Sequence, residues 1–63
     1  MNTYVVVRNY AYEGETVLTA GIDWNTLYEF AKVESQYLNE YQSKDSIIIY
    51  TFTNGIEVDS LEL

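Results

Sequence analysis

The stretch Ile47-Ile48-Ile49-Tyr50-Thr51-Phe52-Thr53-Asn54-Gly55-Ile56-Glu57-Val58-Asp59-Ser60-Leu61 decides how this chain folds. Two runs rich in β-branched and aromatic residues flank the dipeptide Asn54-Gly55, and such runs are typical of strands. A tight type I′ turn needs a positive φ at both central positions, which Asn-Gly adopts readily. The stretch therefore predicts a β-hairpin with Asn54-Gly55 at its turn.

A second hairpin is predicted nearer the N-terminus. Residues 4–12 and 16–22 are again rich in β-branched and aromatic side chains, and each run predicts a strand. The segment Glu13-Gly14-Glu15 between them supplies the turn, so the simplest arrangement pairs the two strands directly.

Residues 24 to about 42 predict a helix between the two hairpins. Asp23 has a side chain suited to the N-cap, and Thr26 with Glu29 offers a capping box one turn later. At about 100° per residue, the apolar side chains gather on one side of this helix. They are Trp24, Leu27, Phe30, Ala31, Tyr37, Leu38 and Tyr41. The polar segment 43–46 ends the helix.

These elements predict one α+β domain over residues 1–63. Its element order is ββαββ, with a four-stranded antiparallel sheet and one helix packed on one face. The order of the strands within the sheet does not follow from the sequence.

The charge balance narrows the choice of partners. Ten Asp and Glu residues oppose three Lys and Arg residues, which gives a net charge of −7. Phosphate backbones are repelled by such a chain, so we expect no direct binding of nucleic acid. Two interpretations of the acidity stay open: it keeps a small aromatic-rich protein in solution, or it attracts the basic surface of a protein partner.

The residue types of this chain give little support for catalysis, for cofactor binding or for a membrane segment. The chain has no His and no Cys, so the usual general base and the usual thiol nucleophile are both missing. The acidic pairs Glu57/Asp59 and Glu13/Glu15 are interpreted as solvated charge. We therefore expect no enzymatic activity and no cofactor. The absence of thiols, of a signal-like N-terminus and of any long apolar run predicts a cytoplasmic protein without a membrane segment.

A single helix covers only one face of a sheet, and both faces of this sheet are predicted to be apolar. One set of strand residues is aliphatic and is expected under the helix: Val5, Val7, Ala11, Ile47, Ile49 and Val58. The other set is rich in rings: Tyr4, Val6, Arg8, Tyr10, Tyr12, Ile48, Tyr50 and Phe52. With a two-residue turn, the expected cross-strand pairs are Phe52–Glu57, Tyr50–Asp59 and Ile48–Leu61.

The ring-rich set is the candidate surface for a partner. Its proposed contacts are Tyr10, Tyr12, Tyr50, Phe52, Glu57 and Asp59, because aromatic side chains give large contact areas and carboxylates give direction. The competing interpretation is that these are ordinary amphipathic tyrosines that cover the sheet. If the surface is used, either a second copy of the chain or a foreign protein occupies it.

Glu34 is the remaining candidate contact. Its helical angle lies within the apolar arc, where an unpaired buried carboxylate is costly. Either the helix extends past the sheet, or Glu34 reaches Arg8 or a Tyr hydroxyl, or Glu34 lies at an interface with another chain.

In general character the chain resembles small acidic phage-encoded inhibitor proteins that disarm host enzymes. It is similar to the phage inhibitors of uracil-DNA glycosylase in being short, acidic and free of Cys, with strand, strand, helix and strand in order over Tyr4 to Phe52. The Asn54-Gly55 hairpin departs from that pattern, and no residue role is transferred. The resemblance implies an anti-defence inhibitor of a host nucleic-acid-processing or defence enzyme, located in the host cytoplasm and often a homodimer.

Two mechanisms are open within this hypothesis. A DNA mimic presents carboxylates at phosphate-like spacing and binds in a strongly salt-sensitive way. A plug relies on its rings and is less sensitive to salt, and the scattered acids favour this second mechanism. The alternative function is a structural or regulatory homo-oligomeric accessory protein without an enzyme target. A protein that sequesters small molecules in a pocket between subunits is a third possibility.

Overall fold

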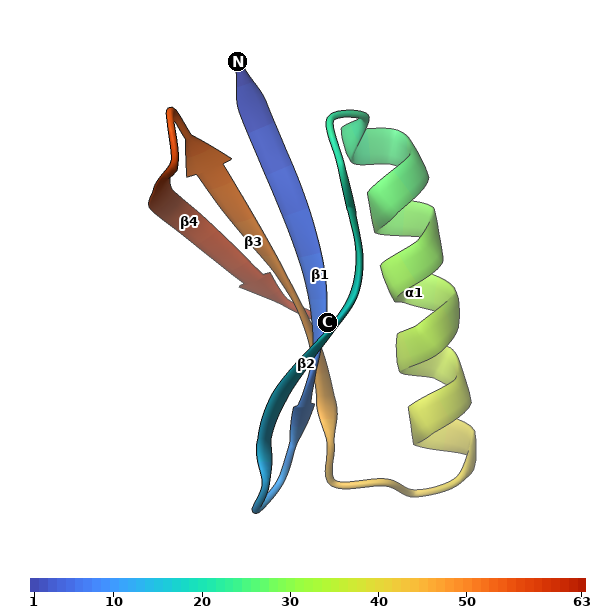
Figure 1. The fold of residues 1–63 in the computed structure, drawn as a ribbon. Helices are drawn as coiled ribbons and strands as arrows, with labels where there is room; N and C mark the ends of the chain where they lie inside the picture. Colours follow the sequence, from blue (N-terminus) through green and yellow to red (C-terminus); the bar gives the residue numbers. More distant parts are fainter.

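The computed structural model describes all 63 residues. Its elements are β1 (Asn2–Tyr10), β2 (Gly14–Gly21), α1 (Trp24–Glu40), β3 (Ser46–Thr53) and β4 (Ile56–Glu62). The four strands form one antiparallel sheet in the order β2-β1-β3-β4, and α1 lies along one side of it (Figure 1). The predicted α+β fold with ββαββ order is confirmed.

The turn between β3 and β4 has the predicted chemistry. Asn54 and Gly55 adopt φ values of 52° and 82°, the left-handed values that a type I′ turn requires at both central positions. The hairpin that these residues close extends away from α1 (Figure 1), and every residue of β4 is exposed.

A β-bulge in β4 shifts the rest of this hairpin by one residue. Phe52 pairs with Glu57 as predicted, but Val58 has no partner. The pairs beyond it are Thr51–Asp59, Tyr50–Ser60, Ile49–Leu61 and Ile48–Glu62. The predicted pairs Tyr50–Asp59 and Ile48–Leu61 are therefore wrong. Because paired residues share a face of the sheet, Asp59 lies on the face opposite to that of Glu57.

The pairing of β1 with β3 decides which side chains face the helix. Val6 pairs with Ile49 and Val7 with Ile48, so even-numbered residues of β1 share a face with odd-numbered residues of β3. The helix packs on the face of Val6 and Ile49, both of which have no exposed surface. The predicted grouping of Val5 and Val7 with Ile47 and Ile49 under the helix is wrong.

The core lies between this face and one side of α1. Its six members are Val6, Leu27, Ala31, Leu38, Ile47 and Ile49. Trp24 closes one end, since its ring contacts that of Tyr4 edge-on at 5.2 Å between centroids and stacks on that of Tyr28 at 5.8 Å. The apolar side of α1 that the helical angles predicted is wider than the side that is buried against the sheet. Phe30, Tyr37 and Tyr41 lie at the border of this predicted side and are exposed.

Asp23 caps the N-terminus of α1 as predicted. Its carboxylate accepts hydrogen bonds from the backbone N–H of Asn25 at 3.1 Å and from the hydroxyl of Thr26 at 2.8 Å. The backbone bond satisfies one of the amides that a helix start leaves without a partner. Thr26 thus donates to Asp23 and does not begin a separate capping box with Glu29.

The C-terminus of α1 ends in a Schellman motif. The backbone N–H of Ser43 donates to Leu38 at 2.9 Å, and that of Gln42 donates to Asn39 at 3.1 Å. Gln42 has a φ of 55°, in the left-handed region where glycine is usual and other L-residues are strained.

Replacement of Gln42 by Gly is expected to stabilise the protein by about 0.5–1 kcal/mol. The relief of left-handed strain exceeds the added entropy that glycine gives to the unfolded chain. Thermal unfolding followed by circular dichroism measures the change. Gln36→Gly in the exposed helix interior is the control, and it should cost about 1 kcal/mol. Equal destabilisation by both variants would contradict a strained helix end.

Candidate functional site

The face of the sheet turned away from α1 is left uncovered, and we call it the open face. It carries alternate residues of every strand: Thr3, Val5, Val7 and Asn9 of β1, Glu15, Val17 and Ala20 of β2, Ile48, Tyr50 and Phe52 of β3, and Glu57, Ser60 and Glu62 of β4. The helix packs only on the other face (Figure 1). Side chains of the sheet alone therefore shape this surface.

Tyr50 crosses the open face. Its hydroxyl donates a hydrogen bond of 2.7 Å to the carboxylate of Glu15. Tyr50 belongs to β3 and Glu15 to β2, and these strands are separated by β1. Adjacent strands lie about 4.8 Å apart, so the ring must pass over β1 to make this bond.

Two residues near the crossing ring are buried although no helix covers this face. Tyr50 lies opposite Val5, and Glu15 lies opposite Asn9. Val7 is the residue of β1 between them that shares their face, and only 5% of it is exposed. Its partner Ile48 is 9% exposed. The centre of the open face is therefore a buried aliphatic strip, beside which the side chain of Tyr50 reaches towards Glu15.

The same hydrogen bond changes the acidity of the phenol. It raises the pKa of Tyr50 above its ordinary value, because a phenolate can no longer donate to Glu15 and is repelled by its charge. The hydrogen bond between Tyr50 and Glu15 is therefore kept at pH values below the ordinary pKa of a tyrosine. It is lost only when the pH rises through the raised pKa of Tyr50.

All charges on the open face are negative. Its carboxylates belong to Glu15 on β2 and to Glu57 and Glu62 on β4, the two edge strands. The three cations of the chain lie elsewhere: Arg8 on the helix side of β1, Lys32 on α1 and Lys44 in the loop before β3. The face thus has an apolar centre between two acidic edges.

The structure brings together only part of the predicted set of contacts. Tyr50, Phe52 and Glu57 share the open face, where Tyr50 and Phe52 are half-buried. Asp59 lies on the helix side because of the bulge at Val58. The predicted grouping of Asp59 with Tyr50 and Glu57 is therefore wrong.

The two N-terminal tyrosines lie at one end of the sheet. Tyr10 is the last residue of β1, on the helix side of the sheet, and Tyr12 stands in the following turn with 89% of its surface exposed. The predicted grouping of Tyr10 with Tyr50 and Phe52 on one face is wrong, because even-numbered residues of β1 share a face with odd-numbered residues of β3.

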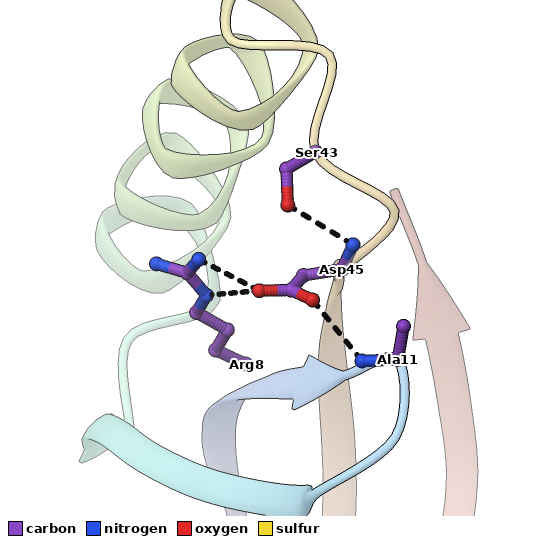
Figure 2. A network of polar contacts seen from close by, with 4 residues as sticks. All are labelled: Arg8, Ala11, Ser43 and Asp45. Atoms are coloured by element: carbon purple, nitrogen blue, oxygen red, sulfur yellow. Dashed lines mark hydrogen bonds and ion pairs between the residues drawn. The ribbon is translucent and has the colours of Figure 1, made fainter.

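Arg8 and Asp45 form the ion pair that joins this end of the molecule. Both Nε and Nη2 of Arg8 donate to Oδ2 of Asp45, at 2.9 and 2.7 Å, and Oδ1 accepts the backbone N–H of Ala11 at 3.0 Å (Figure 2). The N–H of Asp45 itself donates to the hydroxyl of Ser43 at 3.1 Å. One carboxylate thereby ties the loop after α1 to both β1 and the turn that follows it.

These contacts shift the ionisation of both partners. The hydrogen bond from Arg8 and that from Ala11 lower the pKa of Asp45 below its ordinary value. The same ion pair raises the pKa of Arg8, and the nearby charge of Glu34 adds to the effect. Glu34 is half-buried on α1, and it forms no ion pair with Arg8 and no hydrogen bond with a Tyr hydroxyl, so the predicted contact of its carboxylate with either group is not observed.

Glu15, Asp45 and the aliphatic strip were not predicted as site residues. Glu15 follows a turn glycine and Asp45 ends a polar loop, so both resemble ordinary solvated acids in the sequence. Arg8 is the only Lys or Arg among the first 31 residues, and it stands in a predicted strand. Burying a guanidinium without a partner is costly, so its position was the one sequence signal for a nearby carboxylate such as Asp45.

No protein-family model matches this chain, and neither a curated protein nor a solved structure is significantly similar to it. The one helix, at 17 residues, is neither long nor apolar enough to cross a membrane.

Proposed function

We propose that this protein is a non-enzymatic inhibitor that binds a basic protein surface through its open face. The target class that fits the proposal is a nucleic-acid-processing or defence enzyme of a bacterial host, and the source that fits it is a phage. The observation that carries the proposal is the half-exposed apolar centre of the open face, formed by Val5, Tyr50 and Phe52, which lies between edge strands whose only charges on that face are carboxylates.

An apolar centre with a charged border is the arrangement that favours protein partners. Burial of apolar surface supplies affinity, while charges at the border steer the approach and select the partner. Enzymes that act on nucleic acids carry basic surfaces, because they must attract phosphates. The acidic edges of the open face are complementary to such a surface.

The arrangement favours a plug over a mimic of DNA. Glu15 and Glu57 stand on the outermost strands, with β1 and β3 between them. Across three strand spacings of about 4.8 Å, the two edges lie roughly 14 Å apart. The acids therefore flank the apolar strip and do not follow one another as phosphates do along a strand.

The accessory homo-oligomer remains the second candidate, and a different surface favours it. Phe30, Val33, Tyr37 and Tyr41 recur at helical spacing along the flank of α1, each between 38% and 67% exposed. The four side chains of this stripe are uncharged, with Glu34 at its edge, whereas a self-contact through the open face would bring several carboxylates of two copies together. A homodimer would therefore use the helix flank and leave the open face to a foreign partner.

Charge reversal on one face tests the proposed function. The double variant Glu57→Lys/Glu62→Lys should lose at least tenfold in affinity for a protein that the unaltered chain captures from a bacterial lysate. Rim charges of this kind act mainly through the association rate and through salt dependence. Capture followed by mass spectrometry identifies the protein, and surface plasmon resonance then measures the affinity of each variant.

The matched control is Glu29→Lys/Glu40→Lys on the exposed side of α1, which changes the net charge by the same amount. It should bind as the unaltered chain does, and sedimentation should find the same oligomeric state for both variants. Equal losses in the two variants would show that net charge, and not the open face, governs binding. That result would contradict the proposal.

A further inference from the structure

The turn between β1 and β2 forms a shallow pocket beside the Arg8–Asp45 pair. The backbone N–H of Glu13 donates to the carbonyl of Tyr10 at 3.3 Å, which closes the turn over Ala11 and Tyr12. These four residues and Asp45 line a depression of about 220 Å³, which we call the turn pocket. It belongs to one end of the sheet, apart from the strip around Val7.

The lining has the composition of a cation site. The residues that line the turn pocket include two with phenol rings, Tyr10 and Tyr12, and two with carboxylates, Glu13 and Asp45. Tyr12 is 89% exposed. Glu13 is exposed and takes no part in an ion pair, because the one ion pair of the structure joins Arg8 to Asp45. No Lys or Arg lines the pocket to neutralise Glu13.

The chain already holds one guanidinium by the same combination of groups. The guanidinium carbon of Arg8 lies 4.8 Å from the centroid of the Tyr10 ring, while its nitrogens bind Asp45. Stacking on an aromatic face and a forked bond to a carboxylate are the two interactions that suit a planar guanidinium. Tyr12 and Glu13, which are both exposed, add a second phenol and a second carboxylate to the lining of the turn pocket.

We propose that the turn pocket binds the guanidinium of an arginine side chain on a protein partner. Its volume of about 220 Å³ is well above the roughly 10–15 Å³ that a site needs to hold one water molecule, which leaves room for the head group and adjoining methylenes. The carboxylate of Glu13, which has no ion pair, disfavours an anion there. The identity of the macromolecule rests on the proposed function, whereas the chemistry of the pocket rests on its own residues.

A titration of the ¹⁵N-labelled protein with N-acetyl-arginine amide tests the pocket directly. Saturable shifts are expected at the amides of Ala11, Tyr12, Glu13 and Gly14. The citrulline counterpart has the same shape without the charge, and it should bind about tenfold more weakly, since loss of one charge-assisted hydrogen bond is worth about that factor. Glu13→Gln and Tyr12→Ala should each weaken binding of the arginine probe by roughly threefold to tenfold.

The matched controls are Glu40→Gln and Tyr37→Ala, which remove the same groups from exposed positions of α1. They should leave the arginine titration unchanged. Equal shifts with citrulline, unchanged binding in both pocket variants, or shifts spread over all acidic residues would overturn the proposal. A negative result here would leave the test of the open face unaffected, because that test uses other residues and another readout.

Discussion

Replacement of Ile49 by Ala is expected to leave most of the protein unfolded at room temperature. Ile49 lies in the second central strand, faces α1 and has no exposed surface. Truncation of such a side chain costs about 2–5 kcal/mol, through lost burial and the cavity left behind. A core of this size rarely supplies more than about 3–5 kcal/mol in total, so the loss consumes most of the stability.

Urea denaturation followed by circular dichroism measures this effect. Val33→Ala is the control, since Val33 lies on α1 with 62% of its surface exposed. Its stability should change by no more than about 0.5 kcal/mol. A denaturation midpoint for Ile49→Ala close to that of the unaltered chain would mean that the helix does not rest on this part of the sheet.

The second large effect is expected from Asp45→Asn. This change removes the charge that holds Arg8 and weakens the acceptor of the Ala11 amide, so the loop after α1 should detach from the end of β1. The loss of stability should depend on pH. Because the folded pKa of Asp45 lies below that of the unfolded chain, its contribution is complete above about pH 4 and fades as the pH falls through the lowered value.

The difference in unfolding free energy between Asp45→Asn and the unaltered protein should therefore be largest near neutral pH and should shrink towards about pH 2. Urea titrations at a series of pH values give this difference, and hydrogen exchange at Ala11 reports the loop itself. Asp59→Asn, at an exposed residue without a cationic partner, should show little such trend. A gap between Asp45→Asn and the unaltered chain that does not vary with pH would rule out the ion pair as its source.

The fold was predictable because each element carries its own local signal. Asn54-Gly55 defines a turn by its backbone preference, Asp23 defines a helix start, and the spacing of Leu27, Ala31 and Leu38 defines the buried side of α1. The extent of the apolar side was overestimated. Helical angles give only the direction in which each side chain points from the helix axis. Burial also depends on how wide the sheet under the helix is, and the angles carry no information about that width.

The two faces of the sheet were not predictable from alternation. Val5, Val6 and Val7 are all apolar, and so are Ile47, Ile48 and Ile49, so neither run shows which of its residues point to the helix. Only the register of β1 against β3 resolves the phase. The bulge at Val58 was likewise not predicted, because apolar and acidic residues alternate regularly through Ile56-Glu57-Val58-Asp59.

The site was harder still, because its contacts join distant segments. The hydrogen bond of Tyr50 to Glu15 spans 35 residues, and that of Arg8 to Asp45 spans 37. Both depend on the strand order β2-β1-β3-β4, which places β1 beside β3. Composition did indicate an acidic, aromatic surface, but the strand order determines which acids and which rings belong to it.

That strand order also constrains how the protein emerges during synthesis. The two central strands come from opposite halves of the chain, and Ile47 and Ile49 of β3 complete the core that β1 and α1 begin. A nascent chain that ends before residue 46 has a hairpin and a helix but lacks the strand that joins them. Folding of this domain must therefore wait until β3 has left the ribosome, and the segment between β1 and β3 must close before the contacts of β3 stabilise the fold.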